Sequence, residues 1–88
     1  MGREELQELR GKIDALDSEL LRVLAKRFDV ISEIRELKKM NNLPARDEDR
    51  WQEVLSTRLT EAEGLGLPPA FARKVLEAIH ERSLEIEK

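Results

Sequence analysis

The chain has 88 residues, of which 40% are hydrophobic and 40% charged, with a formal net charge of −3. This length suffices for one domain, so we expect a single domain over residues 1–88. The acidic balance argues against nucleic acid as the main partner, because phosphate binding depends on clustered Lys and Arg. The absence of Cys excludes disulfides and thiolate chemistry, and the single histidine, His80, argues against a His-based metal site. Without a membrane-spanning apolar run or a signal-peptide core, we expect a soluble, cytoplasmic protein.

The first predicted element is one long helix from about Glu4 to about Met40. No Gly or Pro lies between Gly11 and Pro44, and apolar residues recur at three- and four-residue spacing. These are Leu6, Leu9, Ile13, Leu16, Leu20, Val23, Val30, Ile34 and Leu37. At about 1.5 Å per residue such a helix spans roughly 55 Å, whereas a compact monomer of this length is about 30 Å across. The apolar stripe therefore needs a second copy to bury it, and we predict an obligate homo-oligomer, most simply a two-fold dimer.

Two shorter helices are predicted to follow. Asp47 is the expected N-cap of the second helix, and a third helix runs from about Pro69 to the C-terminus. The apolar stripe of the second helix is Trp51, Val54, Leu55, Leu59 and Ala62, and that of the third is Phe71, Val75, Leu76, Ile79 and Ile86. Gly64, Gly66, Pro68 and Pro69 mark the break between them. The expected fold class is all-α, with three helices per chain.

Polar residues interrupt two of these stripes. If Ile13 and Leu20 occupy the first position of a heptad, Arg27 occupies the next such position. No acidic residue lies one turn from Arg27, and a buried unpaired arginine is costly, so an anionic ligand is one explanation. A register-setting arginine, or one that reaches solvent, is the other. On the third helix Ser83 and Glu87 continue the apolar face, either as site residues or because the helix frays there.

The charged residues near the helix ends also allow two interpretations. Asp47 and Arg50, three residues apart, fit a cap with a surface pair as well as a binding site. Lys38 suits the end of the first helix because a cation there interacts favourably with the helix dipole, whatever else it does. Their joint order along the chain is more informative than any one of them.

That order resembles the all-helical chorismate mutases over essentially the whole chain. The segment LRGKIDALDSELLRVLAKR is similar to the first helix of that family. LKK places Lys38, RDEDR places Asp47 and Arg50, and AIHERSLEIE places Ser83 and Glu87. The pair Arg50-Trp51 and the segment AIHERS also resemble mutase domains fused to the first synthase of the shikimate route.

The resemblance implies an intertwined homodimer of three-helix chains with two sites, each drawing on both subunits. It implies an isomerase that converts chorismate to prephenate in Phe and Tyr biosynthesis, by an intramolecular 3,3-rearrangement without metal, cofactor or covalent intermediate. Neither nucleic acid nor a membrane is an expected partner. The narrower likeness implies a fused or associated shikimate-pathway synthase.

The resemblance also implies roles for individual residues. Along a helix, Arg10 and Arg27 lie about 25 Å apart and Arg27 and Lys38 about 16 Å, so Arg10 should enter each site from the partner subunit. The implied roles are these: Arg27 and Arg10 of the partner subunit hold the carboxylates, Ser83 contributes a hydroxyl, Arg50 supports the charge balance, Asp47 orients the substrate hydroxyl, and Lys38 and Glu87 flank the ether oxygen.

Two positions depart from much of the family. Glu87 stands where some members carry Gln, and only a protonated carboxyl can donate a hydrogen bond. We therefore expect the rate to fall as rising pH removes the proton from Glu87. Trp51 stands where many members carry a Glu that reads the substrate hydroxyl, which leaves Asp47 for that task.

Other functions fit parts of the pattern. An isochorismate pyruvate-lyase or an aminochorismate mutase would use the same clamp on a related substrate, although the RDEDR run favours chorismate mutase. A noncatalytic regulatory or dimerisation module could sense chorismate or prephenate. A coiled-coil adaptor without a ligand would leave Arg27 and Lys38 unexplained. Loss of chorismate absorbance distinguishes the enzyme from both noncatalytic modules.

Overall fold

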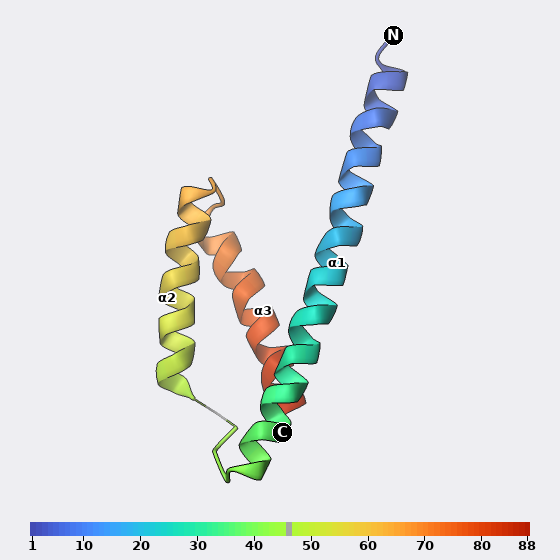
Figure 1. The fold of residues 1–88 in the computed structure, drawn as a ribbon. Coiled ribbons are helices and arrows are strands. Elements are labelled where there is room, and N and C mark those ends of the chain that lie inside the picture. Colours follow the sequence, from blue (N-terminus) through green and yellow to red (C-terminus); the bar gives the residue numbers. More distant parts are fainter. Residues whose placement is uncertain (46) are drawn as a thin grey trace. The chain divides into compact units, whose positions relative to one another are not determined.

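The computed structural model describes residues 1–45 and 47–88, and these form three α-helices (Figure 1). The helices are α1 (Arg3–Met40), α2 (Glu48–Gly64) and α3 (Pro69–Glu87), and the described residues include no strand. The predicted all-α class with three helices is confirmed. Arg46, the first residue of the RDEDR run, lies outside the described residues.

Local hydrogen bonds explain why α1 ends where it does. Asn42 adopts a left-handed backbone conformation with φ of 54°, which Asn tolerates better than most residues. The amide of Asn42 then donates to the Lys39 carbonyl and that of Leu43 to the Lys38 carbonyl, at 3.3 and 2.8 Å. This pair of bonds satisfies carbonyls that the end of a helix would otherwise leave unpaired.

Equally local signals set the ends of α2 and the start of α3. Asp47 caps α2 as predicted, because its Oδ1 accepts a hydrogen bond from the Arg50 amide at 3.0 Å. After α2, Gly66 has φ of 80°, a conformation that costs glycine little, and Leu67 donates to the Ala62 carbonyl at 2.9 Å. Pro69 then opens α3, where a helix needs no N–H donor.

The chain divides into two units, Met1–Val30 and Ile31–Lys88. The first unit is the N-terminal part of α1, in which only Leu24 and Phe28 are even half-buried. Its other large apolar side chains in the helix are between 45% and 66% exposed: Leu6, Leu9, Ile13, Leu16, Leu20, Leu21, Val23 and Val30. Within one chain, nothing in this unit buries the apolar stripe.

The second unit contains the end of α1 together with α2 and α3. These two shorter helices run side by side in opposite directions (Figure 1), as an antiparallel helical hairpin. All the buried side chains among the described residues belong to this hairpin: Leu55, Ala62, Ala72 and Ser83. None of the helices in the described part of the chain carries an apolar stretch that could cross a bilayer.

Candidate active site

The end of α1 contacts the end of α3 through a partly buried polar pair. Lys38 Nζ lies 3.2 Å from Glu87 Oε1 and also donates to the Ala45 carbonyl at 2.8 Å. The Lys38 side chain is 22% exposed and that of Glu87 10%. Glu87 is still helical, so fraying does not explain this polar residue on the apolar face of α3. The structure thus joins two residues that the sequence assigned to one site.

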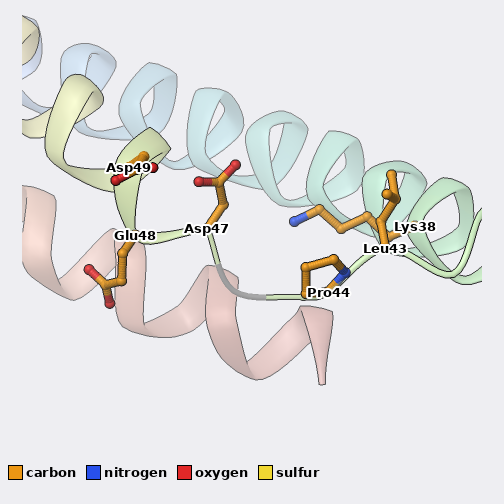
Figure 2. A pocket seen from close by; sticks show the side chains of 6 residues that line it. All are labelled: Lys38, Leu43, Pro44, Asp47, Glu48 and Asp49. Atoms are coloured by element: carbon orange, nitrogen blue, oxygen red, sulfur yellow. The ribbon is translucent and has the colours of Figure 1, made fainter.

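A pocket of about 440 Å³ opens beside this pair (Figure 2). Its lining comes from the end of α1, the connecting loop and the first turn of α2: Lys38, Leu43, Pro44, Asp47, Glu48 and Asp49. Figure 2 shows the Lys38 ammonium directed across the pocket toward the side occupied by Asp47, with Pro44 next to the lysine stem. Lys38 and Asp47, both predicted site residues, therefore face one cavity.

The charge of this lining is unfavourable for an anion. Three carboxylates, those of Asp47, Glu48 and Asp49, share the pocket with one ammonium. That ammonium already contacts a fourth carboxylate, Glu87. Because these carboxylates repel an anion, a dicarboxylate needs further cations to bind here.

Two other predicted site residues lie elsewhere in the second unit. Arg50 forms an ion pair with Glu53 at 3.1 Å, and its side chain is 60% exposed. Ser83 is buried, and its Oγ donates to the Ile79 carbonyl at 2.9 Å, a common use of serine within a helix. Neither residue lines the pocket in the described part of the chain.

Arg10 and Arg27 belong to the first unit, where both are exposed. Their assignment to the substrate carboxylates stays a prediction. Arg27 also interacts with another group of the protein, so it does more than extend into solvent.

The sequence did not single out four of the pocket residues. Leu43 and Pro44 carry no charge, and Glu48 and Asp49 lie in the same acidic run as Asp47. The run itself was the available signal for the two carboxylates. The Ala45 carbonyl, which holds Lys38, could not be anticipated because any residue supplies a carbonyl.

Trp51 and His80 form the one aromatic contact described between α2 and α3. Their rings stack with centroids 3.8 Å apart and planes inclined by 5°. Neither ring lines the pocket. The described residues also contain no group of three His, Cys, Asp or Glu side chains arranged to hold a metal ion.

The described residues form an all-helical fold of three helices, with a lysine–glutamate pair beside a pocket lined by charged residues. The chain belongs to the chorismate mutase type II family, whose family model matches residues 9–88. The family predicted from the order of charged residues is thereby confirmed.

Individual relatives agree with this assignment. The chain is 39% identical to the T-protein of Enterobacter agglomerans over 83 residues, which are 94% of this chain and 22% of that protein. It is 29% identical over 84 residues to a 4-amino-4-deoxychorismate mutase of Streptomyces pristinaespiralis, covering 96% of this chain and 65% of that enzyme. The chain thus spans about a fifth of the T-protein's length.

A solved structure matches the fold over its whole length. It is a conserved hypothetical protein from Pyrococcus furiosus, with a TM-score of 0.77 and 32% sequence identity. The match covers 99% of this chain and 100% of the other. The match therefore includes all three helices of this chain.

Proposed function

We propose that this chain is an isomerase that rearranges chorismate to prephenate, in the biosynthesis of Phe and Tyr. Membership of the chorismate mutase type II family supports the reaction. The observation that carries the proposal is the contact of Lys38 with Glu87 beside a pocket that also presents Asp47. Neither metal nor cofactor takes part.

The chemistry suits these groups. Chorismate carries two carboxylates, a hydroxyl and an enol ether, and its rearrangement transfers no proton, so no nucleophile or general base is needed. An enzyme accelerates it by holding the reactive conformer and by directing donors at the ether oxygen, where negative charge develops. Lys38 has three N–H donors, of which the Ala45 carbonyl and Glu87 use two. The third donor is available to the ether oxygen.

The acidic pocket explains why arginines are required. We assign the substrate carboxylates to Arg27 and to Arg10 of the partner subunit, because a planar guanidinium binds a carboxylate through two parallel hydrogen bonds. Arg50 supports the charge balance. Its present pair with Glu53 is exposed, and such pairs contribute little, about 0–1 kcal/mol, so substrate can compete for Arg50 at small cost.

Asp47 and Ser83 complete the proposed set. Asp47 uses one oxygen to cap α2, and a carboxylate has further acceptor positions with which to orient the substrate hydroxyl. Ser83 must rotate its hydroxyl away from the Ile79 carbonyl before it can donate to a substrate carboxylate. Trp51 stacks on His80 and does not line the pocket. We therefore assign the binding of the substrate hydroxyl to Asp47 and the adjoining acidic residues.

A homodimer provides the partner subunit. The apolar side chains of residues 1–30 are about half exposed, and fully burying one Leu or Ile contributes roughly 1.5–3 kcal/mol. A second copy offers a matching stripe, so a two-fold dimer removes this surface from water and brings Arg10 of the partner subunit to the site. A cytoplasmic location and an associated shikimate-pathway synthase stay predictions.

One relative favours a second candidate. The enzyme from Streptomyces pristinaespiralis is named for 4-amino-4-deoxychorismate, and carboxylates such as Asp47 and Glu48 accept hydrogen bonds from an amino group as readily as from a hydroxyl. Parallel assays with chorismate, isochorismate and 4-amino-4-deoxychorismate decide between the substrates. Turnover of the amino compound alone would replace the first proposal.

The direct test of the proposed function is Lys38→Ala. We expect it to lower kcat for chorismate roughly 10²–10³-fold, the loss typical when a donor to a developing charge is removed. Lys39→Ala is the matched control, because this exposed neighbour carries the same charge at the same helix end. Equal activity of the two variants would exclude Lys38 from the reaction, and an inactive wild type would exclude the function.

A further inference from the structure

The Trp51–His80 stack adjoins the pocket through the backbone of α2. Trp51 lies in the first turn of that helix, and its amide donates to the Asp47 carbonyl at 3.0 Å. Asp47 in turn caps the helix and lines the pocket. The position of the Trp51 ring is therefore tied to that of the Asp47 carboxylate by one helical turn.

His80 connects the same contact to the other side of the site. On α3, residues three and seven positions after His80 share its face, and these are Ser83 and Glu87. Glu87 holds Lys38. The stack thus links the turn of α2 that begins at Asp47 with the face of α3 that ends at Glu87.

The Trp51–His80 stack joins α2 and α3 one turn from Asp47. The buried apolar side chains of the hairpin are Leu55, Ala62 and Ala72, of which only Leu55 lies within one turn of Trp51, and Val54 and Ile79 beside the stack are half-buried. Two planar rings at 3.8 Å with parallel faces restrict both the distance and the tilt between the helices that carry them. The alanines at the far end of the hairpin impose no comparable constraint next to Asp47.

From these contacts we propose that Trp51 and His80 are a positioning pair, which sets the place of Asp47 relative to Lys38 and Glu87 and contacts no substrate. The proposal rests on the proposed function of the site. A misplacement of about 1 Å in a catalytic arrangement costs on the order of 10²-fold in rate, so loss of the stack should reduce kcat more than it raises KM.

The test compares Trp51→Ala, His80→Ala and the double variant with wild type and with Leu59→Ala. Leu59 is half-buried on α2, two turns beyond Trp51, so its truncation removes packing from the same helix away from the pocket. We expect about a tenfold or greater loss of kcat for each single variant and little further loss in the double variant, because both disrupt one contact. Leu59→Ala should lower the unfolding temperature but keep kcat near the wild-type value.

His80→Phe separates the ring face from the ring nitrogens. This variant keeps a planar ring for Trp51 but removes the hydrogen-bonding atoms of His80, so we expect it to retain kcat within about threefold of wild type. A loss as large as that of His80→Ala would overturn the positioning role and assign the effect to the imidazole nitrogens. Single-variant losses equal to that of Leu59→Ala, or losses that multiply in the double variant, would also overturn it.

Fluorescence keeps this test separate from that of the proposed function. Trp51 is the only tryptophan, so its emission reports the stack directly, and it should differ between wild type and His80→Ala. An inactive wild type would refute the proposed function. In that case protein stability tests the stack. If the double variant loses less stability than the sum of the two single variants, the contact is supported. Additive losses of stability, together with unchanged Trp51 emission, would refute it.

Discussion

The two units of the chain differ in how much of their apolar surface is buried within one chain. In residues 1–30 the apolar side chains form a regular stripe that the chain itself leaves about half exposed. In residues 31–88, α2 and α3 pack against each other and bury Leu55, Ala62 and Ala72, although Phe71 and Val75 of α3 remain 56% and 41% exposed. A long amphipathic helix alone cannot bury its apolar stripe, whereas two short helices bury part of theirs against each other.

The charged residues follow the same division. The second unit holds Lys38, Glu87 and Asp47 in contact or around one pocket, and this lining is acidic. The first unit contains Arg10 and Arg27, which we propose as cations for a dicarboxylate, on an exposed helix.

The largest expected effect comes from placing a charge in the apolar stripe of residues 1–30. Leu16→Glu puts a carboxylate where the proposed dimer buries a leucine, and an unpaired buried charge costs several kcal/mol. We expect a monomer by analytical ultracentrifugation and loss of nearly all activity, since Arg10 of the partner subunit is lost. Gln7→Glu adds the same charge to the same helix and should stay dimeric. A dimeric, active Leu16→Glu protein would show that the stripe is not the interface.

Glu87 tests the account of the second unit through its hydrogen-bonding chemistry. Glu87 accepts a hydrogen bond from Lys38 in the structure, but donation to an ether oxygen requires a proton on its carboxyl. Glu87→Gln supplies an amide N–H that donates without such a proton, so we expect this variant to raise kcat for chorismate above the wild-type value. Glu85→Gln is the control, because Glu85 is exposed and pairs with Arg82. An unchanged kcat in Glu87→Gln would remove Glu87 from this role.

Asp47 separates two tasks of one side chain. Asn caps a helix about as well as Asp, whereas Ala costs roughly 1 kcal/mol at this position. We expect Asp47→Asn to unfold at the wild-type denaturant concentration and Asp47→Ala at a lower one. If the carboxylate orients the hydroxyl, both variants should lower kcat for chorismate at least as much as loss of the Trp51–His80 stack does. A kcat lowered only in Asp47→Ala would mean that the cap, rather than the charge, matters.

The sequence predicted the helices well because their ends depend on neighbours in the chain. Asp47 as a cap and the glycine–proline break before α3 act within a few residues, and both predictions are confirmed. The Lys38–Glu87 contact joins residues 49 positions apart, and only family resemblance suggested it. Arg50 was assigned to the site, whereas its contact in the structure is Glu53, three residues along the same helix. That spacing was visible in the sequence, but the substrate that would compete for Arg50 was not.

Aromatic residues show the same limit. Trp51 and His80 lie in segments with recognisable sequence patterns, but nothing in these local patterns indicates that the two rings meet. Which side chains of α2 and α3 stack depends on the rotation of each helix about its axis. The core of the whole hairpin sets this rotation.

The most direct test of the shared site is a mixed dimer of Arg10→Ala chains and Lys38→Ala chains, each inactive as a homodimer. If every site takes Lys38 from one subunit and Arg10 from the other, the mixed dimer has one intact site and one with both lesions. Chorismate turnover per mixed dimer should then be about half that of wild type, because one of its two sites is intact. A mixed dimer without activity would place Arg10 and Lys38 of one chain in the same site and contradict the account.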